Sequence, residues 1–333
     1  MKKQHTELLF VQITPECNMG CRYCPFSNQN NLINRQNNFS AQINSIKNTF
    51  DSKSFTESSF GELIVYGGEA LLYFDQVKRI INEYKNFRHY GKITVCTNGI
   101  LINQDVITYC KTNKINVTIN MDGDFNLVAS NKFFSKTDWA KLTGNIKGLH
   151  SEGIPYDFST TITPHFIENF NSQVKFLESL HPRMIGFNFL RDTQAQKEFG
   201  ISNPDNYLQD ATSLVFKYNS VVNFNRNKKL RAFKEKKQIS DCICSGMGIT
   251  ILATGEYTTC GIFPSQRCRT SREVISIMKE NYKKLFLDIE LGQNIKDLPT
   301  FGGGCSKLLR EDNKRFSYYN AWVSFEQFNY EKL

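Results

Sequence analysis

Short apolar runs rich in β-branched residues alternate with amphipathic stretches through the first two thirds of this 333-residue chain. The runs expected to be strands are 8–14, 62–68, 92–99, 115–123, 155–163 and 183–190. The stretches expected to be helices are 41–50, 72–85, 103–112, 135–150, 168–180 and 204–219. Regular alternation of this kind predicts a parallel sheet covered by helices. These units are too few for a closed eight-stranded barrel, so we expect an α/β fold, a partial (β/α)6 barrel over residues 1–222.

The pattern changes after the sixth unit. A basic segment at 226–237 comes first, and the stretch ITILATGEYTTC at 249–260 then predicts a β-hairpin with its turn at Thr254-Gly255. We therefore place a second, smaller domain at 235–333. A solvated helix or linker is the simple interpretation of the basic segment, and a docking surface for an acidic peptide or electron donor is the alternative.

Composition and charge argue against two classes of protein. No stretch approaches the ~18 consecutive apolar residues of a membrane-spanning helix. The N-terminal segment MKKQHTELLFVQITPEC has a short apolar run and no small-residue cleavage site, so we interpret the run as a strand and expect a cytoplasmic protein. The net charge is +9, yet no zinc-finger, helix-turn-helix or RNA-binding signature accompanies it, which argues against nucleic acid as a partner.

Ten cysteines in a cytoplasmic chain indicate metal or redox sites rather than disulfides, because reducing compartments keep thiols free. Cys17, Cys21 and Cys24 form a C-x3-C-x2-C triplet after the first expected strand, where the loops of parallel-sheet enzymes converge. Three thiolates on one loop can bind three irons of a cubane cluster and leave the fourth iron open to another ligand. Zinc is the competing metal, although structural zinc takes four ligands and no second pair lies nearby.

The triplet, with the aromatic Tyr23 before its last cysteine, resembles the signature of the radical S-adenosylmethionine (SAM) superfamily. Three further matches follow in the family's order at the ends of expected strands: G-G-E-P is matched by Gly67-Gly68-Glu69, T-N-G by Thr97-Asn98-Gly99, and S-I-D-G by Met121-Asp122-Gly123. The chain departs from these motifs at Ala70, which replaces the usual proline, and at Asn120, which replaces the frequent serine. Loss of the proline relaxes the turn, whereas a carboxylate at Glu69 still offers a charge-assisted hydrogen bond to an ammonium group.

The resemblance implies a [4Fe-4S] cluster on the triplet and SAM bound to the open iron through its amino and carboxylate groups. One electron from a reductase such as flavodoxin or ferredoxin then splits a sulfur–carbon bond, and the 5′-deoxyadenosyl radical abstracts a hydrogen atom from the substrate. In the family, the G-G-E-P motif binds the methionine amino group. The residues implied in cofactor binding are Tyr23, Gly67, Gly68, Glu69, Thr97, Asn98 and Asp122.

The C-terminal cysteines resemble a second metal site. The spacing Cys244-x10-Gly255-x4-Cys260 is similar to the hairpin opening of SPASM and twitch auxiliary-cluster domains, and the FGGGC motif is similar to their closing ligand. This resemblance implies one auxiliary [4Fe-4S] cluster, and a zinc site on the same thiolates is the alternative. The expected ligands are Cys244, Cys260 and Cys305, with Cys268 as the fourth and Cys242 as its alternative.

Further residues outside these motifs have a functional interpretation, a structural one, or both. Cys242 is a candidate hydrogen-atom donor or base, and a buried structural thiol is the alternative. Arg191, beside Asp192 at the end of the sixth expected strand, is a candidate to bind the carboxylate of the cofactor or substrate, and a surface ion pair is the alternative. Cys96 and Cys110 stand alone in apolar surroundings and are expected in the core.

Three functions are consistent with these features. The first is modification of a ribosomally made peptide by cross-linking, oxidation or epimerisation, favoured by the auxiliary domain and the basic segment. The first strand begins near residue 8, so a separate leader-peptide-binding protein or direct binding of the peptide is expected. The second is a small-molecule dehydrogenase or epimerase, as in aminoglycoside biosynthesis. The third is a non-catalytic metal-binding protein.

Iron counting after anaerobic reconstitution separates these expectations. We expect about eight irons per chain, because two cubane clusters hold four each, and a brown protein with broad absorbance near ~400 nm. A count of about four irons per chain would contradict the expected auxiliary cluster. A colourless protein that holds zinc would support the non-catalytic function.

Overall fold

The computed structural model of the protein describes residues 8–24, 37–51, 61–87, 91–132, 134–190, 193–225, 227, 248–259 and 267–277. Within these residues, eight strands form one sheet in the order β6-β5-β4-β3-β2-β1-β7-β8. The strands are β1 (Leu8–Gln12), β2 (Glu62–Tyr66), β3 (Lys92–Thr97), β4 (Asn116–Asn120), β5 (Tyr156–Ile162), β6 (Ile185–Phe189), β7 (Gly248–Ile251) and β8 (Tyr257–Thr258). All neighbours pair in parallel except β7 and β8. The predicted open barrel of six β/α units is therefore confirmed.

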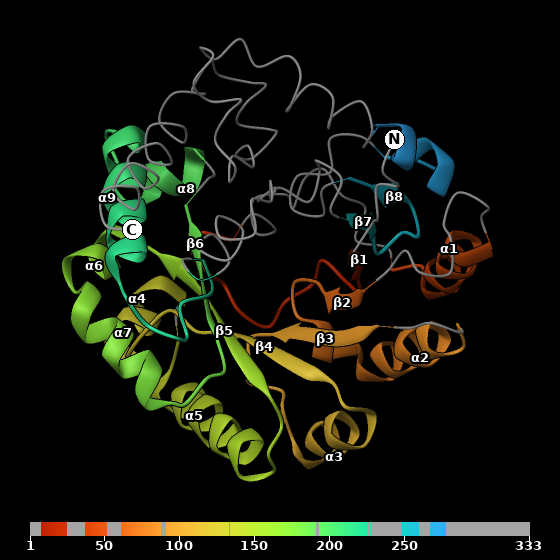
Figure 1. Ribbon diagram of the computed structural model, residues 1–333, viewed down its shortest axis with the longest axis horizontal. Coiled ribbons are helices and arrows are strands. Elements are labelled where there is room, and N and C mark those ends of the chain that lie inside the picture. Colours follow the sequence, from red (N-terminus) through yellow and green to blue (C-terminus); the bar gives the residue numbers. More distant parts are fainter. Residues whose placement is uncertain are drawn as a thin grey trace.

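Helices cover the outer face of the curved sheet (Figure 1). They are α1 (Phe39–Asp51), η1 (Ala70–Tyr73), α2 (Phe74–Lys85), α3 (Gln104–Asn113), α4 (Phe125–Lys132), α5 (Lys136–Ser151), α6 (Pro164–Glu168), α7 (Phe170–Ser179), α8 (Thr193–Glu198) and α9 (Pro204–Lys217). The sequence predicts neither α4, α6 nor α8, and the helix expected at 168–180 corresponds to α7, which follows α6 after Asn169. Within the described residues, no helix is long and apolar enough to cross a membrane.

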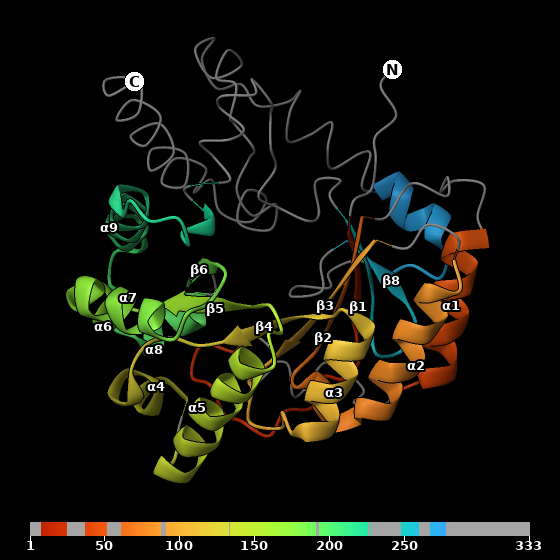
Figure 2. The ribbon, with the colours of Figure 1, turned by 60° about the horizontal axis from the view of Figure 1, so that its bottom comes forward.

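The two faces of the sheet differ in polarity because successive strand residues point to opposite sides. The residues that face the helices are apolar and buried, as Val65, Val95 and Ile119 are. The alternate residues of β4 and β5 on the concave face include Asn120 and Ser159, which are half-buried. Figure 2 shows how the twist of the sheet turns this concave face inward between β1 and β6. The barrel therefore encloses a surface rich in hydrogen-bonding groups.

The predicted hairpin is present, and its first strand extends the barrel sheet. β7 pairs with β1 in parallel from Leu8 opposite Gly248 to Val11 opposite Ile251. The turn contains Gly255, whose φ of +85° suits glycine. The hairpin lies inside the segment that the sequence assigns to the second domain, and the boundary at 235–333 stays a prediction.

The loop that carries the cysteine triplet is held by the turn after β2. The amide of Gly68 donates a hydrogen bond to the carbonyl of Thr14 (2.7 Å), and the amide of Glu69 donates to the carbonyl of Glu16 (2.8 Å). A Cβ on Gly68 would collide with the carbonyl oxygens of Pro15 and Glu16. Glycine is therefore required here for a close approach between two backbones.

Gly68→Ala tests this close approach. We expect the substitution to lower the free energy of unfolding by about 1–3 kcal/mol, because backbone atoms must move to admit the methyl group. Gly144→Ala in α5 is the control, since no heavy atom lies within 4 Å of its added Cβ, and it should stabilise the helix by about 0.5–1 kcal/mol. Urea denaturation measures both, and equal stability of Gly68→Ala and the wild type would contradict the packing described.

Candidate functional site

The three cysteines lie on the loop that leaves the carboxyl end of β1. Cys17 is exposed, whereas Cys21 and Cys24 are half-buried. The amide of Cys24 donates to the carbonyl of Cys21 (3.1 Å), which closes a turn between them, and the amide of Met19 donates to the sulfur of Cys17 (3.4 Å). The pKa of the Cys21 thiol is raised to about 12, mainly by burial; the ammonium of Lys132 lowers it, and Asp122 and the sulfurs of Cys24 and Cys17 contribute to the rise. The three sulfurs therefore share one electrostatic environment.

This donor set fits an iron–sulfur cluster. Among the residues that the structure describes, no three His, Cys, Asp or Glu side chains converge closely enough to hold one metal ion. A cubane cluster does not require such convergence, because each cysteine binds a different iron. Thiolates are also the donors that iron–sulfur clusters select. The loop therefore offers three ligands, and a four-iron cluster bound there would keep one iron free for a further ligand.

Glu69 is a buried carboxylate next to this loop. Its side chain accepts hydrogen bonds from the Thr97 hydroxyl (2.8 Å) and from the amides of Leu71 (2.9 Å) and Asn98 (2.7 Å). The residue is 1% exposed. Burial raises the pKa of the carboxyl group, and the three donors act in the opposite direction. A carboxylate in this environment is suited to bind a cationic group that enters the site.

Asn98 connects Glu69 to the cysteine loop. Its side-chain amide donates to the oxygen of Asn18 (2.7 Å) and lies 3.9 Å from the sulfur of Cys17. Its backbone amide binds Glu69, so the same residue contacts both halves of the site. The T-N-G and G-G-E motifs therefore lie next to the loop that carries the triplet. The sequence predicts this proximity, because all three follow the carboxyl ends of neighbouring strands.

Tyr23 and Asp122 form the other side of the site. The Tyr23 hydroxyl donates to the Asp122 carboxylate, which also accepts from the amide of Thr161 (2.9 Å). Asp122 is fully buried. The ammonium of Lys132, a side chain that is 2% exposed, lies 3.3 Å from the same carboxylate oxygen that accepts the Tyr23 hydroxyl. The described contacts thus engage Asp122 with the protein itself, and its direct contact with a cofactor stays a prediction. The sequence identified neither Lys132 nor Thr161, because a lysine in a short helix is ordinarily expected at the surface.

The outer side of the cysteine loop contacts the segment after β6. Arg22 donates to the carbonyl of Glu198 (2.9 Å), and its guanidinium lies 4.7 Å from the centre of the Phe199 ring. The Tyr23 and Phe199 rings are also neighbours, with centres 6.4 Å apart. The loop is therefore held both by the turn after β2 and by the segment after β6.

The remaining predicted cysteines divide into two groups. Cys110 is buried, as expected for a core residue, whereas Cys96 is half-buried because it lies on the polar concave face of β3. Cys268 is buried, and its backbone exchanges two hydrogen bonds with Tyr257 of β8 (2.7 and 2.8 Å). The other candidates lie outside the described residues: Cys242, Cys244, Cys260, Cys305 and Arg191.

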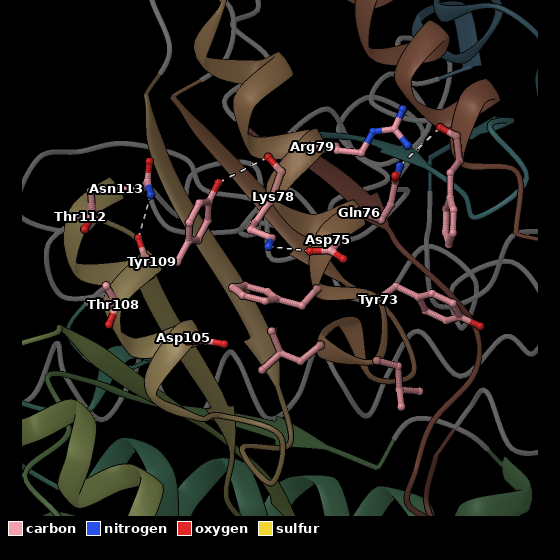
Figure 3. A pocket seen from close by; sticks show the side chains of 14 residues that line it. Tyr73, Asp75, Gln76, Lys78, Arg79, Asp105, Thr108, Tyr109, Thr112 and Asn113 are labelled. Atoms are coloured by element: carbon pink, nitrogen blue, oxygen red, sulfur yellow. Dashed lines mark hydrogen bonds and ion pairs between the residues drawn. The ribbon is translucent and has the colours of Figure 1, made fainter.

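A pocket of about 820 Å³ lies on the outside of the barrel, between α2 and α3 (Figure 3). Its lining includes Phe74 and Tyr109, whose rings meet edge to face with centres 5.6 Å apart. Tyr73 also lines it and donates to the carboxylate of Glu16 (2.6 Å), directly before the first cysteine. The pocket therefore adjoins the cysteine loop from the helix layer and is separate from the concave face.

Comparison with known proteins gives a family match and solved structures of similar fold. A family model described as the radical SAM superfamily matches residues 11–180. A solved structure of anSMEcpe with bound AdoMet and Kp18Cys peptide has a TM-score of 0.72 at 14% identity, covering 98% of this chain and 97% of that one. Streptococcus suis SuiB bound to precursor peptide SuiA has a TM-score of 0.64 at 14% identity, covering 93% and 74%. Methylornithine synthase (PylB) has a TM-score of 0.53 at 12% identity, covering 84% and 83%. No curated protein matches the chain at a significant level.

Thr97→Val tests the hydrogen bonds around Glu69, with Thr97→Ser as the matched control. The Thr97 hydroxyl donates to Glu69 and accepts from the amide of Gly99 (3.0 Å), so its loss leaves two buried polar groups without that partner. We expect Thr97→Val to lower the free energy of unfolding by about 1–3 kcal/mol relative to Thr97→Ser.

The penalty should also depend on pH. Loss of a donor raises the pKa of Glu69 further in Thr97→Val. A folded protein with a raised carboxyl pKa keeps its stability at low pH, where the group is protonated, and loses stability as the pH rises through the folded-state pKa. The difference between the two variants should therefore grow as the pH increases above 4.5, the ordinary value for this group. Urea denaturation across pH measures it, and a pH-independent difference would contradict the role given to this hydroxyl.

Proposed function

The chain belongs to the radical SAM superfamily, and from this premise we propose that it reductively cleaves SAM and uses the product to remove a hydrogen atom from a peptide substrate. The observation that carries the proposal is the position of the buried Glu69 carboxylate directly beside the loop that bears Cys17, Cys21 and Cys24. Asn98 contacts both, which places a cation-binding group beside a loop with three metal-binding thiols.

Each residue of the site has a distinct part in this proposal. The three cysteines hold the [4Fe-4S] cluster, which supplies the electron that splits SAM. Glu69 binds the methionine ammonium, because it is a buried carboxylate held in place by three donors. Gly67 and Gly68 bring its backbone against the cysteine loop, and Asn98 orients that loop.

A peptide substrate is supported by the fold neighbours and by the concave face. The solved structures of anSMEcpe and SuiB contain peptides. In this chain, the concave face below the site presents neutral hydrogen-bonding side chains, of which the exposed Asn188 donates to the Ser159 hydroxyl (2.8 Å). Such a surface is suited to the amide groups of an extended peptide. A small polar molecule is the alternative substrate.

Several components complete the proposal. We assign an auxiliary [4Fe-4S] cluster to Cys244, Cys260, Cys305 and Cys268, with Cys242 as an alternative ligand or as a hydrogen-atom donor. Arg191 is the candidate for binding a carboxylate. A reductase such as flavodoxin or ferredoxin supplies electrons, and the enzyme works in the cytoplasm. The peptide substrate binds either through a separate leader-peptide-binding protein or directly.

Product analysis tests the proposed cleavage. We expect the reconstituted protein to release 5′-deoxyadenosine from SAM under dithionite, because the triplet leaves one iron open. Cys21→Ser should abolish the release and lower the iron content by about four per chain. Cys110→Ala is the control, since that buried thiol lies in α3 outside the site. Unchanged release by Cys21→Ser would contradict the proposal.

The substrate class is tested by the same assay in deuterated water. Candidate precursor peptides and candidate amino sugars are incubated separately, and products are analysed by mass spectrometry. We expect the peptide to change mass, with a gain for epimerisation or a loss of two hydrogens for cross-linking or dehydrogenation. A change in the sugars alone would instead support the small-molecule alternative.

A further inference from the structure

Lys132 is a buried cation at the carboxyl end of α4. Its side chain is 2% exposed, although lysine is almost never fully buried without a partner. The ammonium donates to the carbonyl of Asn120 (2.7 Å) and to that residue's side-chain oxygen (3.2 Å), and it lies 3.3 Å from the Asp122 carboxylate. All three contacts are at the carboxyl end of β4, next to the cysteine loop.

The same group of residues holds the cysteine loop at two points. Asp122 accepts the hydroxyl of Tyr23, and the carbonyl of Asn131 accepts the amide of Arg22 (2.9 Å). Arg22 and Tyr23 lie between the second and third cysteines. Any displacement of the Lys132–Asp122 pair is therefore transmitted to the part of the loop that carries Cys21 and Cys24.

The charges of the pair also act on the cysteines. The Asp122 carboxylate accepts the Tyr23 hydroxyl, and Lys132 follows Asn131, whose carbonyl accepts the Arg22 amide, so both charges lie beside the part of the loop between Cys21 and Cys24. Both charges are out of water, so solvent screens them weakly. A cubane cluster with three thiolates carries a net negative charge, and uptake of one electron from the reductase adds another. A nearby cation favours the reduced form, and a nearby anion disfavours it.

Resting on the proposed function, we propose that Lys132 is a positioning residue of the cluster site. It orients Asp122 and Tyr23 against the cysteine loop, and its buried charge sets the reduction potential of the cluster. Asp122 acts on the potential in the opposite direction. Asn120, where the family often has serine, completes the cage around the ammonium.

The test is an EPR-monitored redox titration of the reconstituted full chain without substrate. The signal that changes on addition of SAM identifies the cluster with the open iron. We expect the midpoint potential to shift to more negative values in Lys132→Met and to more positive values in Asp122→Asn. Lys132→Arg keeps the charge and should remain closer to the wild type than Lys132→Met does.

The outcomes distinguish this inference from the proposed function. A wild type without a SAM-responsive cluster would overturn both, whereas a responsive wild type with the same potential in every variant would overturn only the inference. Shifts of the same sign in Lys132→Met and Asp122→Asn would also overturn it. A general loosening of the loop would move both potentials in one direction, whereas removal of opposite charges moves them in opposite directions. If Lys132→Met does not fold, Asp122→Asn decides: a positive shift supports the inference, and no shift or a negative one contradicts it.

Discussion

The backbone contact between the turn after β2 and the loop after β1 is the constraint on which the rest of the site depends. Two parallel strands carry the cysteines and Glu69, and their continuations touch because Gly68 has no side chain. The hydrogen bonds from Gly68 to Thr14 and from Glu69 to Glu16 then fix where each loop begins. The contacts of Asn98 with the cysteine loop and of Thr97 with Glu69 depend on where these two loops are held.

The site contains buried charges that a purely structural design would omit. Glu69, Asp122 and Lys132 are all withdrawn from water, and each is surrounded by hydrogen-bonding partners. Burial of a charge is unfavourable unless it is paired or hydrogen-bonded, and even a paired buried charge often contributes less to stability than well-packed apolar residues of similar volume. Charged groups in this position are characteristic of functional sites, where electrostatics serve the ligand and the reaction.

The polarity of the sheet separates stability from function. Its outer face packs apolar residues against helices and supplies the core, whereas its concave face carries hydroxyl, amide and thiol groups. The cysteine loop and Glu69 lie at the carboxyl ends of these strands, at the rim of that face. A substrate that lies along the concave face would thus approach the cofactor site without contact with the core.

Local patterns in the sequence were enough to predict the parallel strands, most of the helices and the turn at Gly255, because periodicity and turn chemistry act over a few residues. The triplet and the strand-end motifs likewise predicted which residues gather, since parallel strands bring their carboxyl ends to one edge. The pairing of β7 with β1 and the burial of Lys132 against Asp122 could not be predicted in this way. Both depend on contacts between segments that are distant in the chain or on the partners of a side chain, and only the packed tertiary structure decides them.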